Sequence, residues 1–585
     1  MTSRRPSTTP SSAFAPPRTT RGGLYASLAA SFVAGATLGQ APDAVPPAKK
    51  DRYLVKLGAS TPDGQEPRLH SGRLILFFLP DTARWAGVAP ADGPFQTAPY
   101  PIASVAVRDA AEGGEIVIEI DPLATASADS TALGALAELD GAWRVQAVLD
   151  SDFTEAGHLG PGNLLSETVS IELARDAADE VSIALATRLG KPDAPGPTAR
   201  GVERFERTSR LLGEALRRAA SIRATVVLPH GYDDLAFPRR IWPTIYVLGD
   251  FGSTADDALA AAPPLRDPRA RAAVPQAVWV FLDTAAPWGY GAFCDSDTNG
   301  PMARALVEEF IPALEERFRL IPRADARVLL GHGFGGWSAM HLALTRPETF
   351  GSCFASAPDF VDFSAIGRID LYRDTSFFTT RDGGDAPAIR SIIGPDDDRI
   401  HLVMREQIAA ERAIDPRGRS GQPWAARDAM WSPWQVERNA PRPICDMETG
   451  AIDLIAGEAW SRFDIAKRLE RDPASAGPLL ASRVHVLCGT RDSLYRNEAV
   501  ARLRAKLEEW RARETAAGRP PAGGGWIEIV DGPDDESLRQ LAILRFHREI
   551  AADLRAAGHA EAIRLDEENR SLEAPRPAPV PRPGG

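Results

Sequence analysis

The sequence has little cysteine and no apolar run as long as a membrane-spanning helix needs. Its four cysteines, among 585 residues, are too few and too widely spaced for a disulfide scaffold or a zinc ribbon. None precedes Cys294, so a lipid-modified N-terminal cysteine is not expected. Glycine, with 49 residues, is far too rare for collagen. With 44% hydrophobic and 25% charged residues, the composition is that of an ordinary folded protein.

Positive charge is also scarce relative to negative charge. The 67 basic residues against 79 acidic ones give a net charge of −12, and only six of the basic residues are lysine. An acidic chain lacks the overall attraction to phosphate that nucleic-acid-binding proteins use, and the arginines are scattered among acids. We therefore expect no nucleic-acid partner. The oligomeric state does not follow from the sequence.

The first 51 residues are interpreted as a signal peptide and a linker. An apolar run at 24–38 (LYASLAASFVAGATL) follows four arginines and precedes small residues, which is the order of a secretory signal. The run is shorter than the roughly 20 residues of a spanning helix. We expect export to the periplasm or the medium, with no membrane span after removal of the signal. At the other end, 561–585 is predicted to be an extended Pro-rich tail.

Residues 52–190 are predicted to form a small, immunoglobulin-like β-sandwich. Short runs rich in Val and Ile are broken by Gly, Pro and Asp, which is typical of such a fold. The clearest runs lie at 72–78, 114–120, 143–150 and 167–173. A linker rich in Gly and Pro follows at 191–203.

Residues 204–560 change to apolar strands that alternate with helical patterns. Continuous apolar strands between helices indicate a doubly wound, mostly parallel α/β sheet. Its strands are expected at 224–229, 244–249, 277–283, 327–336, 350–358, 483–489 and 526–532, and its helices near 302–319, 497–515 and 537–557. The alternation is interrupted at 361–481, an insertion long enough to cover the carboxyl edge of the sheet, where such folds bind ligands.

The segment VLLGHGFGG at 328–336 predicts a strand, a tight glycine turn and a helix start. At this place an α/β-hydrolase has G-x-S-x-G, a strained turn that presents the nucleophilic serine. Here the middle residue is Gly333, which has no oxygen for attack on a carbonyl group.

The chain resembles the putative-esterase family of α/β-hydrolases, which includes esterase D, feruloyl esterases and enterochelin-esterase-like proteins. The similar segments are VVLPHGY at 226–232, TIYVLGDFG at 244–252, PWGYGAFCDSDTNGP at 287–301, the elbow region at 329–351 and CGTRD at 488–492. The resemblance implies a Ser–Asp–His triad, in that chain order, that acts on acyl esters. It places Gly333 on the serine position and Asp492 on the acid position.

The triad histidine is missing as well. After Asp492 the sequence has only His547 and His559, both in helical patterns. The loop where the histidine belongs is acidic, and Asp535 marks its approximate position. A base activates the nucleophile and an acid orients the base, so Asp492 alone has nothing to orient. We therefore expect that only the double change Gly333→Ser/Asp535→His restores activity.

Other residues are candidates for ligand contacts or for substitute catalytic groups. The ligand-cleft candidates are Phe251, Trp288, Tyr290, Asp295, Asp297, Asn299 and His332. The run from Asp295 opens like a calcium loop, but Leu306 stands where the bidentate acid belongs, so no metal or other cofactor is expected. Ser338 is interpreted as a helix-surface or helix-packing serine. Asp359 and Asp362 are possible alternative acids, but a role at the pocket rim or plain solvation is favoured for them.

Three functions stay open at this point. The favoured one is a catalytically inactive esterase-family protein that retains a cleft for an ester, a glycan or a protein partner. The second is an active ester hydrolase with groups recruited from the insertion, where the candidates are His401, Arg405, Glu406 and Glu411. The third is a structural or assembly protein.

Overall fold

The computed structural model describes the chain between Asp51 and His559 with several gaps. The described residues are 51–58, 68–93, 100–120, 130–133, 136, 139–151, 157–174, 179–190, 200–233, 240–253, 257–267, 274–390, 399–533 and 536–559. The predicted signal peptide, the Pro-rich tail, most of the predicted linker at 191–203 and Asp535 lie outside these residues.

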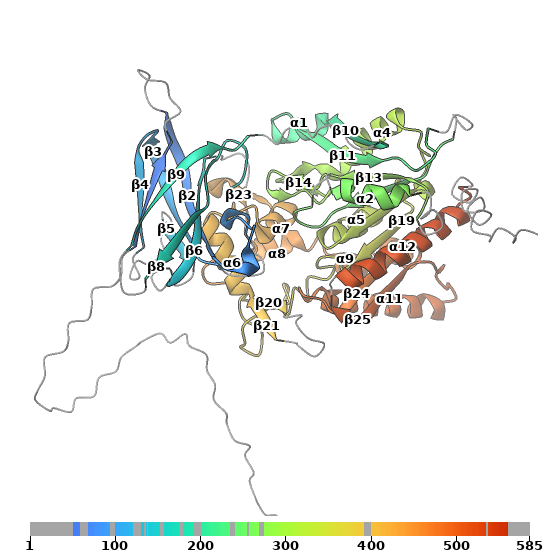
Figure 1. Cartoon of the computed structure of the whole chain (residues 1–585). Coiled ribbons are helices and arrows are strands. Elements are labelled where there is room, and N and C mark those ends of the chain that lie inside the picture. The colour runs from blue at the N-terminus through green and yellow to red at the C-terminus, as the bar shows by residue number, and fades with distance from the viewer. Residues whose placement is uncertain are drawn as a thin grey trace, which may run out of the picture. The chain divides into compact units, whose positions relative to one another are not determined.

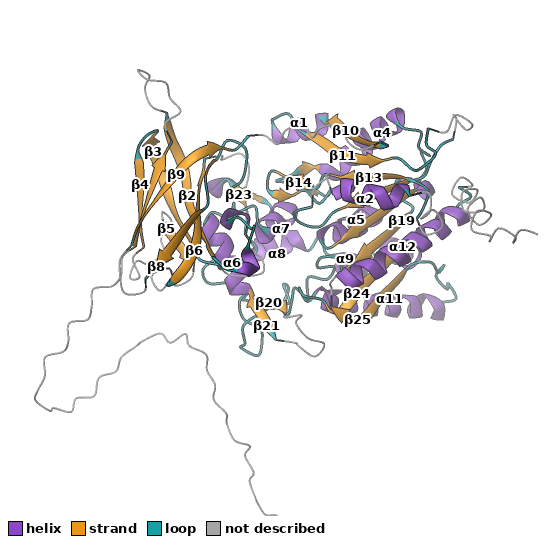
Figure 2. Ribbon diagram, in the orientation of Figure 1, coloured by secondary structure: helices purple, strands orange, loops and turns teal. Residues whose placement is uncertain are grey.

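The N-terminal part is one nine-stranded sheet (Figures 1 and 2). Its strands are β1 (Asp51–Leu57), β2 (Leu69–Pro80), β3 (Ile102–Ala111), β4 (Glu115–Ile120), β5 (Ser130–Leu133), β6 (Gly141–Asp150), β7 (Leu164–Ser166), β8 (Val169–Leu173) and β9 (Glu180–Arg188). Along the sheet their order is β4-β1-β9-β7-β6-β2-β3-β5, with β8 beside β6.

The predicted sandwich is not confirmed, because a sandwich has two separate sheets and here every strand joins one hydrogen-bonded ladder. The parallel pair of β1 with β9 joins segments that lie more than a hundred residues apart in the chain. Side chains of β1, β2, β6 and β9 meet in a single apolar cluster, which includes Tyr53, Phe78, Val145 and Ile183. The sheet therefore curves around one core.

The second sheet has eight strands, in the order β10-β11-β13-β12-β18-β19-β24-β25. These are β10 (Val202–Thr208), β11 (Ser221–Val227), β12 (Thr244–Leu248), β13 (Val278–Leu282), β18 (Arg327–His332), β19 (Ser352–Ser356), β24 (Val484–Arg491) and β25 (Trp526–Pro533). From β13 to β25 all neighbours are parallel, whereas β10 and β11 are antiparallel to their neighbours.

Both faces of this sheet are apolar, as the continuous hydrophobic runs of its strands require. On β12 and β18, Ile245 and Val328 belong to one cluster, and their neighbours Tyr246 and Leu329 belong to another. The first cluster contains residues of α2 (Asp257–Arg266) and α12 (Glu536–Ala556), which lie in front of the strands in Figure 1. The second contains residues of α5 (Phe334–Thr345) and α11 (Arg496–Ala516).

The other described α-helices and the two-stranded pairs lie, along the chain, between strands of the second sheet. The helices are α1 (Arg210–Leu216), α3 (Met302–Ala305), α4 (Ile311–Arg317), α6 (Met404–Ile414), α7 (Pro423–Trp431), α8 (Leu454–Trp460), α9 (Ile465–Arg471) and α10 (Pro473–Arg483). The two-stranded pairs are β14 (Ala285–Ala286) with β15 (Gly289–Tyr290), β16 (Asp295–Ser296) with β17 (Gly300–Pro301), β20 (Pro387–Arg390) with β21 (Ile400–Val403), and β22 (Trp434–Gln435) with β23 (Ala440–Pro441).

The segment between β19 and β24 contacts the N-terminal sheet through α6. Ala413 and Ile414 are buried in one cluster with Ile75, Phe77 and Ile102 of β2 and β3. The hydroxyl of Ser104 on β3 also donates a hydrogen bond to the carbonyl of Ala413.

All four cysteines are described, and each is a buried free thiol. Among the described helices, none is both long enough and apolar enough to cross a lipid bilayer.

Candidate functional site

The glycine turn forms as the sequence predicts. β18 ends at His332, α5 begins at Phe334, and Gly333 between them has φ +56° and ψ −123°. This positive φ is unfavourable for residues that carry a Cβ. The turn is also tightly packed, because a Cβ at Gly331 would lie 2.1 Å from the carbonyl oxygen of Gly335.

The carboxylate of Asp250 lies directly against this turn. Leu248, the last residue of β12, is paired with Gly331, and this pairing brings the loop after β12 to the elbow. Asp250 Oδ1 accepts hydrogen bonds from the backbone N–H of Phe334 (2.9 Å) and of Phe251 (2.8 Å). A Cβ built on Gly333 would lie 2.2 Å from the same oxygen. The carboxylate therefore fills the space that a side chain at position 333 needs.

Asp250 was not among the site residues predicted from the sequence, although it lies in the segment TIYVLGDFG at 244–252, which carries the family resemblance. One signal was present, since Asp250 follows a buried strand at the edge of the sheet where α/β folds place their ligands. The contact itself joins residues 84 positions apart and is not readable from one sequence.

Asp492, the expected acid, is fully buried just after β24. It pairs with the guanidinium of Arg496 at 2.9 Å and accepts from the backbone N–H groups of Leu494 and Arg496. Among the described residues, no serine or histidine hydrogen-bonds to this carboxylate. Arg496 is therefore the charged partner of Asp492 in the described structure.

The two histidines that follow Asp492 have other surroundings. His547, on α12, packs edge-on against Trp279 with ring centroids 5.1 Å apart, and burial lowers its pKa to about 4. His559 Nε2 lies 3.3 Å from Asp325. The role predicted for position 535 stays a prediction, because Asp535 is not described.

A serine and an imidazole do lie together at the rim of the sheet. His332 and Ser356 are paired residues of β18 and β19, and His332 Nδ1 is 2.9 Å from Ser356 Oγ. Ser356 is 7% exposed, and its carbonyl accepts from the N–H of Gly333. Burial, followed by the nearby Arg496, lowers the pKa of His332 to about 3, so the imidazole is neutral at pH 7.

The aromatic cleft candidates are mostly packed against other side chains. The hydroxyl of Tyr290 donates to the carbonyl of Gly249 at 2.7 Å, and its ring contacts Phe334 edge-on. Trp288 is 6% exposed and packs against Trp434. Phe251 is half-buried beside Phe334. A ligand contact for these rings stays a prediction.

The polar candidates from the 287–301 segment have separate partners. Asp295 binds the guanidinium of Arg346 at 2.9 Å and the N–H of Arg304. Asn299 donates to the carbonyl of Tyr290, and Asp297 is exposed. Within the described ranges, no three His, Cys, Asp or Glu side chains gather into a group that could hold a metal ion.

Arg427, on α7 of the insertion, makes a buried ion pair at the elbow that the sequence did not indicate. Its guanidinium binds Asp359 through two hydrogen bonds of 2.9 Å. It also lies 4.5 Å from the ring centroid of Phe334 and 4.4 Å from that of Trp424. The backbone N–H of Asp359 donates to the carbonyl of Gly333, so this pair ties the insertion to the turn.

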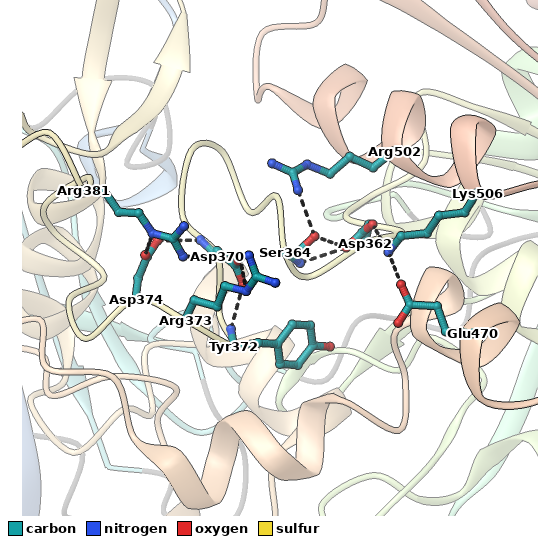
Figure 3. A network of polar contacts seen from close by, with 10 residues as sticks. All are labelled: Asp362, Ser364, Asp370, Tyr372, Arg373, Asp374, Arg381, Glu470, Arg502 and Lys506. Atoms are coloured by element: carbon teal, nitrogen blue, oxygen red, sulfur yellow. Dashed lines mark hydrogen bonds and ion pairs between the residues drawn. The ribbon is translucent and has the colours of Figure 1, made fainter. Parts of the chain in front are cut away.

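Asp362 has a structural environment of its own. Figure 3 shows Lys506 between Asp362 and Glu470, at 2.8 and 2.7 Å, and Arg502 directed at Ser364. Ser338 is fully buried, and its hydroxyl donates to the carbonyl of Phe334 one helical turn earlier.

The substitute groups proposed from the insertion are engaged elsewhere or exposed. Glu411 accepts from the N–H groups of Trp424 and Ala425 at the start of α7, and burial raises its pKa. Glu406 accepts from the N–H of Val403, Arg405 lies over the ring of Phe378, and His401 is exposed.

Comparison with known proteins identifies the family. The family model described as Putative esterase matches residues 221–517, more than half of the 585-residue chain. No curated protein matches the sequence.

Solved structures of esterases are similar to this chain at low identity. A ferulic acid esterase is 14% identical, with 60% of this chain and 98% of that chain covered and a TM-score of 0.34. An S-formylglutathione hydrolase from Agrobacterium tumefaciens is 16% identical, with 61% and 98% covered and a TM-score of 0.33. The enterobactin esterase from Shigella flexneri is 12% identical, with 86% and 93% covered and a TM-score of 0.33. The assignment rests on the family model: the chain belongs to the putative-esterase family of α/β-hydrolases.

Proposed function

We propose that this chain is a member of the esterase family that does not hydrolyse esters. The observation that carries the proposal is the elbow: the residue between β18 and α5 is Gly333, which has no side chain, and the space beside it holds the carboxylate of Asp250. Loss of the nucleophile from a serine triad lowers kcat on the order of 10⁶-fold in other enzymes.

The surroundings of the acid position support the same proposal. The carboxylate of Asp492 is paired with Arg496, and a cation at that place satisfies the charge that would otherwise orient an imidazole. The imidazole of His332 lies near enough for the charge of Asp492 to act on it, but no hydrogen bond joins these two described side chains, as a triad would require.

Several further features belong to the proposal. The parallel strands and the apolar clusters on both faces support a doubly wound sheet, and the N-terminal sheet with its own apolar cluster supports an accessory domain. We propose export through the segment at 24–38, domains at 52–190 and 204–560, and an ester, glycan or partner-binding role at the carboxyl edge. Phe251, half-buried beside the elbow, supports the last of these.

A second candidate is an active hydrolase that uses Ser356 and His332. The 2.9 Å contact between Nδ1 and Oγ favours it. Two observations weigh against it. An imidazole with a pKa near 3 is a weak base at neutral pH, and the two backbone N–H groups beside the elbow already bind Asp250.

Turnover of short-chain nitrophenyl esters and labelling by a fluorophosphonate probe test the proposal. The expected result is no turnover above the buffer rate and no specific labelling. Ser356→Ala is the informative variant, and Ser338→Ala, a buried serine on α5, is its matched control. Turnover or labelling that Ser356→Ala abolishes and Ser338→Ala retains would replace the first proposal with the second.

A further inference from the structure

We infer that the carboxylate of Asp250 occupies the oxyanion hole of this fold. The N–H groups of Phe334 and Phe251 form an anion-binding site, and Asp250 blocks the access of a substrate to it. The inference rests on the proposed function, because it adds a third lost element to the missing nucleophile and the missing base. It also names the ligand class of the site, which is a small carboxylate.

The two donors are those that a working elbow would use. An oxyanion hole in this fold is made by the N–H of the residue after the nucleophile and by a second N–H from the loop after a neighbouring strand. Here these are the N–H groups of Phe334 and Phe251, and both donate to Asp250 Oδ1, at 2.9 and 2.8 Å. One oxygen of the protein itself therefore takes the place of the negatively charged oxygen of a reaction intermediate.

Gly333 is the residue that makes room for this carboxylate. A Cβ at position 333 would lie 2.2 to 2.4 Å from the three atoms of the Asp250 carboxyl group, far inside contact distance. A nucleophilic side chain at position 333 and the Asp250 carboxylate in its present position therefore exclude each other. Neither a serine nor an alanine fits at 333 while the Asp250 carboxylate keeps its position.

The electrostatics favour a carboxylate there. Phe334 is the first residue of α5, a twelve-residue helix, so its N–H lies at the positive end of the helix dipole. The N–H of Phe251 comes from a different element and converges on the same oxygen. Hydrogen bonds from two N–H groups to a charged oxygen are stronger than those to a neutral one.

The test removes the carboxylate and returns it as a free anion. Asp250→Ala should lower the thermal midpoint by about 5 °C, and sodium formate or acetate should restore part of that loss relative to sodium chloride at equal ionic strength. The wild type should show no formate-specific shift. Asp283→Ala is the matched control: Asp283 also follows a sheet strand, but it pairs with Arg223, so formate should not rescue it.

Asp250→Asn keeps an acceptor oxygen without the charge, and its thermal midpoint should lie between that of the wild type and that of Asp250→Ala. A midpoint equal to that of the wild type for either Asp250 variant, or no formate-specific recovery in Asp250→Ala, would overturn the inference. These outcomes concern stability and an added anion only. They remain distinct from ester turnover by the wild type, which would overturn the proposed function instead.

Discussion

The carboxylate of Asp250 lies where a side chain at position 333 would stand. This carboxylate comes from the loop after β12, and its position depends on the absence of a Cβ at residue 333. Substitution at either position therefore changes the surroundings of the other. Variants at the elbow have to be designed as pairs.

This coupling changes the expectation for restoring activity. Gly333→Ser/Asp535→His should stay inactive, because the new side chain and the Asp250 carboxylate compete for the same space and for the same two N–H groups. Addition of Asp250→Gly should permit specific labelling by a fluorophosphonate probe, which needs the nucleophile and the hole but no complete turnover cycle. Labelling of the double variant to the same extent as the triple variant would contradict this.

The buried ion pair between Asp359 and Arg427 also contacts the elbow, because the N–H of Asp359 donates to the carbonyl of Gly333. Arg427→Met should lower the free energy of unfolding by about 3–5 kcal/mol, because it leaves the Asp359 carboxylate buried without its partner. Urea denaturation measures this. Arg504→Met, which removes an exposed i,i+4 pair with Glu508, is the control and should change it by less than about 0.5 kcal/mol. If both variants changed the free energy of unfolding equally, the buried pair would contribute no more to stability than an exposed one, which would contradict the prediction.

At the scale of elements, α9 lies in the insertion, and its Arg468 donates a hydrogen bond to the carbonyl of Leu344 on α5. Asp464 caps this helix by accepting from the N–H of Lys467, and it also accepts from the N–H of Phe363 and the hydroxyl of Tyr372. Burial, followed by the nearby Asp362, raises its pKa to about 6. The carboxyl group is therefore more easily protonated in the folded state than in the unfolded state.

The pH dependence of this element follows from that shift. Between about pH 4 and pH 6 the native state binds more protons at Asp464 than the unfolded state does, so its contribution to stability falls as the pH rises. Relative to Asp464→Asn, which retains a helix-capping side chain, the wild type should lose about 3 kcal/mol from pH 4 to pH 7. Chemical denaturation of both proteins across this range measures the difference. A difference that does not vary with pH would contradict the assignment.

The elements of the second sheet could be predicted closely, and those of the insertion could not. The runs expected at 244–249, 277–283 and 526–532 form β12, β13 and β25, because continuous apolar runs are readable from local pattern alone. In the N-terminal part, the pairing of β1 with β9 depends on partners far apart in the chain, which single-sequence patterns do not encode.

The site shows the same division. The elbow was predicted because its signal is local, whereas the contacts of Asp250 and Arg427 join distant segments. The Asp492–Arg496 pair is an intermediate case. Its members are only four residues apart, but Asp492 lies in the turn before α11, so the helical i,i+4 rule does not predict the contact.

On the scale of the whole molecule, buried neutral histidines set the response to acid. Burial lowers the pKa of His158 and His547 to about 4 and that of His332 and His341 to about 3. Their folded-state pKa values lie below the unfolded value of 6.5, so the stability they contribute is complete above that pH and is lost as the pH falls.

We expect the thermal midpoint to fall steeply from pH 6.5 to pH 4. Each histidine should lose about 2–3 kcal/mol over this range, which together outweighs the opposite contribution of Asp464. His547→Phe, which retains a ring against Trp279, should reduce the fall, and the exposed His401→Phe should not. A midpoint that stays level down to pH 4 would contradict this prediction.

The insertion is fastened at two separate places. Ala413 and Ile414 of α6 pack against apolar residues of the N-terminal sheet. Arg427 of α7 forms an ion pair with Asp359 and lies over the ring of Trp424. A rigid-body movement of the insertion would therefore have to break both its contact with the N-terminal sheet and its ion pair with Asp359.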